Sequence, residues 1–510
     1  MKRKLGLVFI MLLLMVGTWG AWQWAEGKTG LQTPPQGSAP DLTPKPEQGP
    51  EQEPEQEQVQ PVPEEQEFAV RGVIEGFYGE PWTHSQRLDL LAFMGRQHFN
   101  TYVYAPKDDP YQRRQWGDLY PPGLGGQMRS LAETAKRNGI DFVYSISPGI
   151  PMPLPTEQAT PEWVTNSITI TSQGDQQRLL AKIDQLRGYG VHDFLLSFDD
   201  VQEIVKPEDQ AVYGNDYATA HVDLANEVYR MEKEKDPDFQ LWFAPTDYYG
   251  LGDSGYWRAI RSGLDPAIPV IWTGEWVLNQ AVTSQQADRV AELLGRKPML
   301  WDNFPVNDYT YAINKRPQLI MGPLENRSAD LGEHLSGYLT NPQIQPEASK
   351  VALATIGDYL HDPHGYDAQA AWKAAMQAPD GVQDAEALLL FCKYAAESKL
   401  RPAGNPDFAT LAANYWQNRD PAALRQEFQA LAGLPERLRR STNNPALLAE
   451  IDPWLTKLGR EGQAGLLALD YLQDPADTGE PFRALLGQIE ANNLKIGEEI
   501  VEFLQQAAQQ

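Results

Sequence analysis

Cysteine is almost absent from this sequence, and basic residues are few. The single cysteine, Cys392, excludes an internal disulfide and a cysteine-based metal site. The 43 lysines and arginines stand against 69 aspartates and glutamates, so the formal net charge is −26. A surface this acidic repels phosphate groups, which argues against nucleic acid and anionic membranes as partners.

Common catalytic motifs are also missing where they would be expected. None of the first strand-to-helix turns reads G-x-G-x-x-G, no G-x-S-x-G occurs, and none of the seven histidines forms H-x-x-x-H. Their absence argues against a dinucleotide-binding open sheet, an α/β serine hydrolase and a histidine-based zinc site. With 42% apolar residues among 510, the chain can nevertheless form the cores of two or three domains.

The first 30 residues predict export. Lys2, Arg3 and Lys4 precede 18 uncharged residues, 5–22, which have the form of a secretory signal peptide and are just long enough to span a bilayer. We expect either a cleaved signal peptide or, because tryptophans flank the stretch, a retained anchor that attaches the protein to the membrane. In both cases the folded part is extracellular, secreted or anchored on the outer side of the cytoplasmic membrane.

Residues 31–67 predict a tether. Proline, glutamate and glutamine account for 25 of these 37 positions, so the segment has too little apolar surface to fold. We therefore expect the folded part of the chain to begin at Phe68.

Short apolar runs alternate with helical patterns over residues 68–345. The runs predict eight strands, at Val70–Glu75, Thr101–Ala105, Asp141–Ser147, Phe194–Asp199, Gln240–Thr246, Pro269–Thr273, Pro298–Asp302 and Leu335–Thr340. Eight strands with helical connections over this length are typical of a (β/α)8 barrel, also called a TIM barrel. The sequence after residue 345 is rich in alanine and leucine and has no strand signal, so residues 346–510 predict an all-helical bundle.

The fourth apolar run, "FLLSFDDV" (194–201), ends in two adjacent acids, Asp199 and Asp200. At a strand tip the chain turns, so both side chains can reach one pocket at the carboxyl end of a barrel, where active sites lie. Two acids in different environments can take different pKa values and roles, as glycoside hydrolysis requires. Aromatic residues that could stack on sugars lie near other strand tips: Tyr78, Tyr104, Tyr248, Trp272 and Trp301.

A metal site is the alternative interpretation of the same acids. Asp199 and Asp200, together with other acids near strand tips, could bind Mg²⁺ or Ca²⁺ through their oxygens. These further acids are Asp108, Asp109, Asp302 and Asp308. A bare pair of aspartates does not decide between a metal site, a solvated turn and an acid–base pair.

Seven segments in order resemble the family 84 glycoside hydrolases, the β-N-acetylglucosaminidases that include the O-GlcNAcases. They are "GVIEGFYGEPWTHSQR" (72–87), "NTYVYAPKDDPY" (100–111), "SFDDV" (197–201), "FAPTDYYG" (243–250), "VIWTGEWV" (270–277), "LWDNFPVNDY" (300–309) and "GYLTNP" (337–342). The resemblance covers about residues 70–345, and only loosely the helical region. It implies exo-acting removal of terminal β-linked N-acetylglucosamine from glycoconjugates, with retention of configuration and with the substrate's own acetamido group as nucleophile.

The resemblance also implies roles for particular residues. Asp199 would stabilise the acetamido nitrogen, and Asp200 would act first as general acid and then as general base. Tyr248 would support the acetamido oxygen, while Trp301 and Thr273 would shape the N-acetyl pocket. Five residues would hold the sugar's hydroxyls and the carbonyl-bearing end of its ring, Gly76, Lys107, Asn303, Asp308 and Asn341, and Tyr78 would line the site. No cofactor and no metal are implied.

Two other functions compete with this interpretation. One is a non-catalytic module that binds N-acetylglucosamine, and the other is a metal-dependent enzyme acting on glycans or phosphoryl groups. The intact acid pair argues against the first, and the second predicts that a chelator abolishes activity. The proline-rich segment 148–175 departs from the family pattern and leaves the preference beyond the first sugar open.

Overall fold

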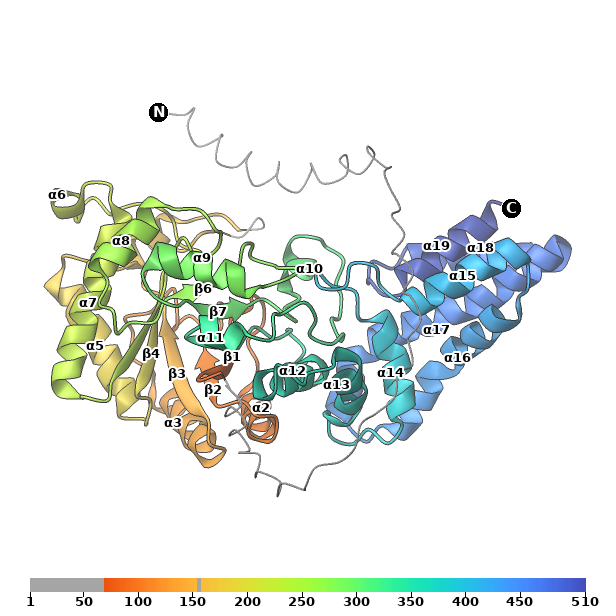
Figure 1. Cartoon of the computed structure of the whole chain (residues 1–510), viewed down its shortest axis with the longest axis horizontal. Coiled ribbons are helices and arrows are strands. Elements are labelled where there is room, and N and C mark those ends of the chain that lie inside the picture. The colour runs from red at the N-terminus through yellow and green to blue at the C-terminus, as the bar shows by residue number, and fades with distance from the viewer. Residues whose placement is uncertain (1–67, 154–156) are drawn as a thin grey trace, which may run out of the picture. The chain divides into compact units, whose positions relative to one another are not determined.

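The computed structural model describes residues 68–153 and 157–510 (Figure 1). The predicted signal or anchor segment and the predicted tether both lie outside these residues. Within the described ranges, none of the helices combines the length and the apolar character that a membrane span requires.

All eight predicted strands are present and form one parallel sheet. They are β1 (Arg71–Glu75), β2 (Thr101–Tyr104), β3 (Asp141–Ile146), β4 (Asp193–Ser197), β5 (Gln240–Ala244), β6 (Ile271–Trp272), β7 (Met299–Asp302) and β8 (Gly337–Thr340). Their order in the sheet is β5-β4-β3-β2-β1-β8-β7-β6, and β1 pairs with β8. A parallel bridge between Phe243 and Val270 joins β5 to the segment before β6, so the sheet closes into the predicted barrel.

Strand β6 is shorter than the prediction of Pro269–Thr273. Pro269 has no N–H to donate, and its carbonyl accepts from Phe243 N at 2.9 Å at the edge of β5. At the other end, Thr273 N donates to Tyr248 O, a loop carbonyl, at 2.8 Å. Strand β6 is therefore Ile271–Trp272, and Val270 before it forms a single bridge to Phe243.

Helices surround the strands, as Figure 1 shows. The main ones are α2 (His84–Arg96), α3 (Pro122–Arg137), α5 (Gln173–Arg187), α7 (Tyr217–Lys235), α8 (Gly255–Gly263), α9 (Ser284–Leu294) and α11 (Leu331–His334). Short helices α4 (Pro161–Asn166), α6 (Gln210–Tyr213) and α10 (Asp308–Ala312) interrupt the loops after β3, β4 and β7. Capping boxes fix the starts of two helices, with Thr83 and Gln86 at α2 and Thr283 and Gln286 at α9.

The barrel has two separate apolar layers. Alternate strand residues point inward and form a small cluster that includes Ile74, Val103, Val143, Leu195 and Leu339. The residues between them point outward and join the larger core shared by strands and helices. The inner cluster fills the barrel below its carboxyl end, so that the loops after the strands are left to form a site.

The region after β8 is helical throughout, as predicted. Its helices are α12 (Pro346–His361), α13 (Ala368–Ala374), η1 (Ala375–Gln377), α14 (Ala385–Tyr394), α15 (Pro406–Asn418), α16 (Ala422–Ser441), α17 (Pro445–Gln473), α18 (Pro475–Glu490) and α19 (Glu498–Ala508). The long helices α16 and α17 pack along each other. Helix α12 contacts both α2 of the barrel and α17. Because α12 packs against both the barrel and the helical region, the domain boundary at residue 345 stays a prediction.

Candidate active site

The acid pair lies directly after β4, at the carboxyl end of the barrel. Strand pairing ends at Ser197, and Phe198 N donates to Ala244 O at 2.7 Å. Asp199 is buried and Asp200 is half-buried. Asp200 has a φ of 52°, a left-handed conformation that aspartate tolerates better than most residues. The turn gives the two neighbouring carboxylates different surroundings.

Asp199 is held between two cations. Lys107 Nζ donates to Asp199 Oδ2, and Arg113 Nη2 lies 3.6 Å from the same oxygen. Burial by itself would raise the pKa of Asp199, but the charges of Lys107 and Arg113 outweigh it and hold that pKa below its usual range. Within the described residues the other oxygen, Oδ1, is buried and accepts no hydrogen bond. Asp199 is therefore an ionised group with one acceptor left for a ligand.

Asp200 is held by two tyrosines, and among the described residues no lysine or arginine pairs with its carboxylate. Tyr78 Oη donates to Asp200 Oδ2 at 2.9 Å, and Tyr248 Oη donates to Oδ1 at 2.7 Å. Burial, followed by the charge of Asp200, raises the pKa of each tyrosine well above its usual value. Both hydroxyls therefore stay protonated and act as donors. Tyr78 and Tyr248 therefore lie at the acid pair, the position that the family resemblance implies for them.

Lys107 is buried at the site and not solvated. Its Nζ lies 5.1 Å from the Trp301 ring centroid and 5.9 Å from that of Tyr78. Burial lowers its pKa, and the nearby charge of Asp199 only partly offsets that effect. Lys107 thus links the acid pair to the rings of Trp301 and Tyr78.

The tips of β1, β7 and β8 meet through a chain of amides. Gly76 N donates to Asn341 Oδ1 at 3.2 Å, and Asn341 Nδ2 donates to Asn303 Oδ1 at 2.8 Å. Trp301 lies against Gly76 so closely that an added Cβ would come within 2.3 Å of Trp301 Cζ2. Trp301 Nε1 is buried and makes no hydrogen bond within the described residues. Glycine at position 76 is therefore what lets the indole lie over this end of the barrel.

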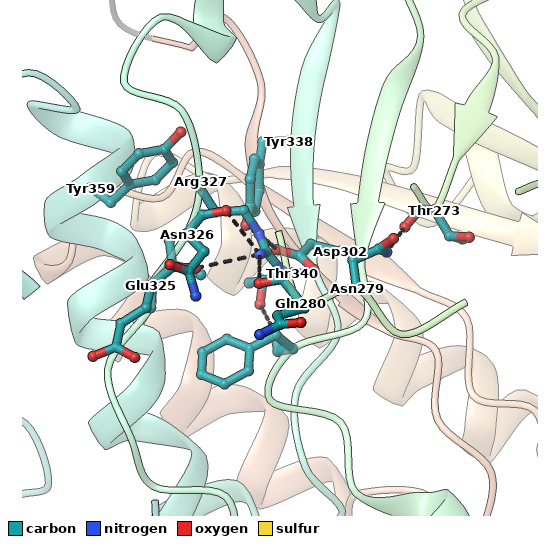
Figure 2. Close-up of polar contacts among 12 residues, drawn as sticks. Thr273, Asn279, Gln280, Asp302, Glu325, Asn326, Arg327, Tyr338, Thr340 and Tyr359 are labelled. Atoms are coloured by element: carbon teal, nitrogen blue, oxygen red, sulfur yellow. Dashed lines mark hydrogen bonds and ion pairs between the residues drawn. The ribbon is translucent and has the colours of Figure 1, made fainter. Parts of the chain in front are cut away.

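Asp308 and Thr273 complete the predicted set. Asp308 Oδ2 accepts from Tyr78 N at 2.8 Å, and burial raises the pKa of Asp308. Thr273 N donates to Tyr248 O at 2.8 Å, while Thr273 O accepts from Asn279 Nδ2 at 2.7 Å. The Thr273–Asn279 contact is visible in Figure 2. Asp308 thus fixes the backbone of Tyr78, and Thr273 fixes that of Tyr248.

Arg113 was not predicted from the sequence. It is 3% exposed, and its Nη1 and Nη2 donate to the backbone carbonyls of Asp200 and Asp199, each at 3.4 Å. The motif "YQRRQW" has a second arginine, Arg114, whose side chain is 45% exposed and pairs with Glu157. Position on a loop after a strand tip is the only sequence signal, and it does not distinguish the two arginines.

Two acids at strand tips belong to closed networks outside the barrel wall. Arg327 Nε and Nη2 donate to Asp302 at 2.8 and 2.9 Å, and Tyr338 also donates to this carboxylate, as Figure 2 shows. Glu75 is bound in the same way by Arg87, through two contacts of 2.7 Å. These acids stabilise the layer between strands and helices.

The acids that a metal site would need are therefore dispersed. Asp109 accepts from Tyr104 Oη and Tyr120 Oη, both at 2.8 Å, and Asp302 is held by Arg327. Across residues 68–153 and 157–510, no three metal-ligating side chains gather. The remaining predicted aromatics, Tyr104 and Trp272, are buried packing residues; Trp272 Nε1 donates to Gly250 O at 3.1 Å.

Comparison with known proteins agrees with this geometry. The sequence model of a beta-N-acetylglucosaminidase family matches residues 71–393, and one described as hyaluronidase post-catalytic domain-like matches residues 409–502. The chain is 34% identical over 294 residues to Protein O-GlcNAcase from Rattus norvegicus, and equally to that from Mus musculus. Each match covers 56% of this chain but only 29% of the relative's length.

Two solved structures share the fold across most of the chain. A mutant of the Thermobaculum terrenum O-GlcNAc hydrolase is 29% identical with a TM-score of 0.77, and the match covers 86% of this chain and 94% of that one. The structure called CpGH84B is 28% identical with a TM-score of 0.74, and the match covers 86% of this chain and 77% of that one. The likeness therefore includes the helical region as well as the barrel.

Proposed function

Because the chain belongs to the beta-N-acetylglucosaminidase family, we propose that it removes terminal β-linked N-acetylglucosamine from glycoconjugates. We propose further that the reaction retains configuration and uses the substrate's acetamido group as the nucleophile. One observation supports this best: two adjacent carboxylates have opposite surroundings, Asp199 between two cations and Asp200 between two tyrosine hydroxyls.

Asp199 suits the acetamido nitrogen. When the acetamido oxygen attacks C1, an oxazoline ring forms and positive charge develops on that nitrogen. An ionised carboxylate stabilises this charge and accepts the N–H. Asp199 Oδ1, which has no partner among residues 68–153 and 157–510, offers the acceptor. Lys107 and Arg113 keep the group ionised before substrate arrives. Trp301 and Thr273 enclose the N-acetyl group in this scheme.

Asp200 suits the glycosidic oxygen. As general acid it gives its proton to that oxygen while the C1–O bond breaks and the alcohol leaves. As a carboxylate it then takes a proton from water, whose oxygen attacks C1 and reopens the oxazoline. A positioned group of this kind is worth about 10²–10⁴-fold in rate.

Tyr248 lies between Asp200 and the proposed position of the acetamido group. In the structure its hydroxyl donates to Asp200 Oδ1 at 2.7 Å. In our scheme the bound acetamido oxygen takes over this hydroxyl. Lys107, Asn303, Asp308 and Asn341 hold the sugar's hydroxyls meanwhile.

The test is hydrolysis of aryl β-N-acetylglucosaminides by the purified protein and by Asp200→Ala. We expect the variant to lose about 10²–10⁴-fold in kcat on poor leaving groups and much less on a nitrophenol, which needs no proton. The β-anomer of the free sugar should appear first in proton NMR. Absence of hydrolysis by the parent protein would refute the proposal and favour a non-catalytic binding module.

We also propose that the folded part acts outside the cytoplasmic membrane, on exported or environmental glycoconjugates. The support is the basic start and the uncharged stretch at residues 5–22. Protease added to intact cells should degrade the protein if it is anchored outside, and the culture medium should contain it if the segment is cleaved. Retention in the cytosol would refute this proposal.

A further inference from the structure

Arg113 touches both members of the acid pair through the backbone. It lies on the loop after β2, and its two terminal nitrogens donate to the consecutive carbonyl oxygens of Asp199 and Asp200 at 3.4 Å each. The same Nη2 lies 3.6 Å from the Asp199 carboxylate. On the other side, Met152 N donates to Asp200 O at 2.8 Å. One buried guanidinium therefore spans the turn at which the two carboxylates diverge.

We propose that Arg113 is a positioning residue that sets the directions of the two carboxylates and keeps Asp199 charged. This inference rests on the proposed function. Asp200 has a φ of 52°, so its backbone conformation is one that the surrounding structure has to hold. A planar fork that binds two successive carbonyls is suited to that task, and a lysine could not reproduce it.

Of the two cations beside Asp199, Arg113 is the one whose charge does not depend on pH. Burial lowers the pKa of Lys107, so its charge is the less secure of the two cations. A guanidinium stays protonated at all pH values at which the protein is folded. The titratable and charged groups facing Asp199 are Lys107, Arg113, Asp200, Tyr78 and Tyr248. Arg113 is the only one of these that cannot change its charge.

The experiment compares Arg113→Gln, Arg113→Lys and the control Arg114→Gln in the full chain. We expect Arg113→Gln to lower kcat at least tenfold with little change in KM. Without the cation, the pKa of Asp199 should rise, so the acid limb of the kcat/KM profile should move up by about one pH unit. Arg113→Lys should leave the limb in place and still lower kcat, because lysine cannot bind both carbonyls. Arg114→Gln should resemble the parent, since Arg114 is exposed and pairs with Glu157.

A second measurement, the NMR titration of Asp199, tests the inference independently of hydrolysis. In ¹³C NMR of protein labelled at aspartate Cγ, with Asp199→Asn for assignment, the Asp199 signal should titrate about one pH unit higher in Arg113→Gln. An unchanged pH limb and an unchanged titration would overturn the inference even if the parent hydrolyses the substrate. Conversely, a shifted titration in a protein without hydrolysis would support the inference while refuting the proposed function. If Arg113→Gln does not fold, a parental kcat in Arg113→Lys would overturn the positioning role.

Discussion

The two ends of strand β4 carry acids of opposite behaviour. At its start, burial first and then the neighbouring Asp141 and Asp236 raise the pKa of Asp193 to about 6. Just beyond its end, the cations Lys107 and Arg113 hold the pKa of Asp199 below its usual range, although Asp199 is the more deeply buried group. Burial alone therefore does not decide the charge of an acid in this barrel; the presence of a cation does.

The same contrast appears between acids at the carboxyl end. Glu75 and Asp302 are bound on both oxygens by arginine, and no carboxylate oxygen of either lacks a partner. Asp199 has one bound oxygen and one buried oxygen that finds no partner in the part of the chain that the structure describes. A closed network stabilises the fold, whereas an open acceptor next to a fixed charge suits a ligand.

Arg327→Met would break this contrast by leaving the buried carboxylate of Asp302 without its cation. The side chains of Arg327 and Asp302 are each 1% exposed, so Asp302 would keep only its hydrogen bond from Tyr338. We expect a loss of about 3–5 kcal/mol in the free energy of unfolding, measured with urea. The double variant Arg327→Met/Asp302→Leu should recover much of that loss, since no buried charge remains.

A matched surface variant serves as control for this prediction. Arg230 lies on α7, is exposed, and pairs with Glu227 and Glu234. Arg230→Met should change the free energy of unfolding far less than Arg327→Met, because water and salt screen an exposed ion pair. Equal effects of Arg327→Met and Arg230→Met would show that burial of the Asp302 pair contributes nothing.

Gly72 on β1 and Gly76 directly after it allow the ends of the barrel to be compared by packing. An added Cβ at Gly72 would come within 2.4 Å of Leu339 Cδ2, and one at Gly76 within 2.3 Å of Trp301 Cζ2. Each alanine variant should cost about 1–3 kcal/mol of stability by overpacking. Only Gly76→Ala should also raise KM, because Trp301 faces the proposed N-acetyl pocket. A raised KM in Gly72→Ala at temperatures where it is folded would contradict this assignment.

Most of the fold could be predicted because each strand is marked by a short apolar run in its own segment of the sequence. Alternation of apolar runs and helical patterns gave eight strands whose bounds agree with the structure to within two residues at each end. The acid pair could be placed at a strand tip because "FLLSF" is apolar and the chain turns immediately after it. All eleven predicted site residues lie at or next to the carboxyl ends of strands, although their roles remain predictions.

What the sequence did not predict depends on contacts between distant segments. Arg113 and Arg114 are neighbours, and only the folded loop decides that the first is buried and the second exposed. The outward direction of Glu75 and Asp302 could have been predicted from strand alternation once Gly76 and Trp301 were assigned to the inside. Their arginine partners could not, because Arg327 follows Asp302 by 25 residues through a loop.

A substitution of Asp193, at the amino end of β4, should have the smallest effect on stability. The contribution of Asp193 to stability depends on pH in the opposite sense to that of Asp199. Asp193 has a folded pKa of about 6, above the usual value of 3.8. The native state therefore binds more protons than the unfolded state between these values, and stability falls as pH rises through about 6. Asp193→Asn removes this penalty, so it should stabilise the protein at pH 7.5 by about 1–2 kcal/mol and have little effect at pH 4.

Thermal unfolding at pH 4 and pH 7.5 tests the predicted effect of Asp193→Asn on stability, and kcat tests whether the variant affects the acid pair. Asp193 lies at the end of the barrel away from the acid pair, so kcat of Asp193→Asn should equal that of the parent. Asp199 has the opposite sign: its stabilising ion pairs are present above the unfolded pKa and are lost as pH falls. If Asp193→Asn were no more stable than the parent at pH 7.5, the claim that the half-buried Asp193 weakens this end of the barrel would fail.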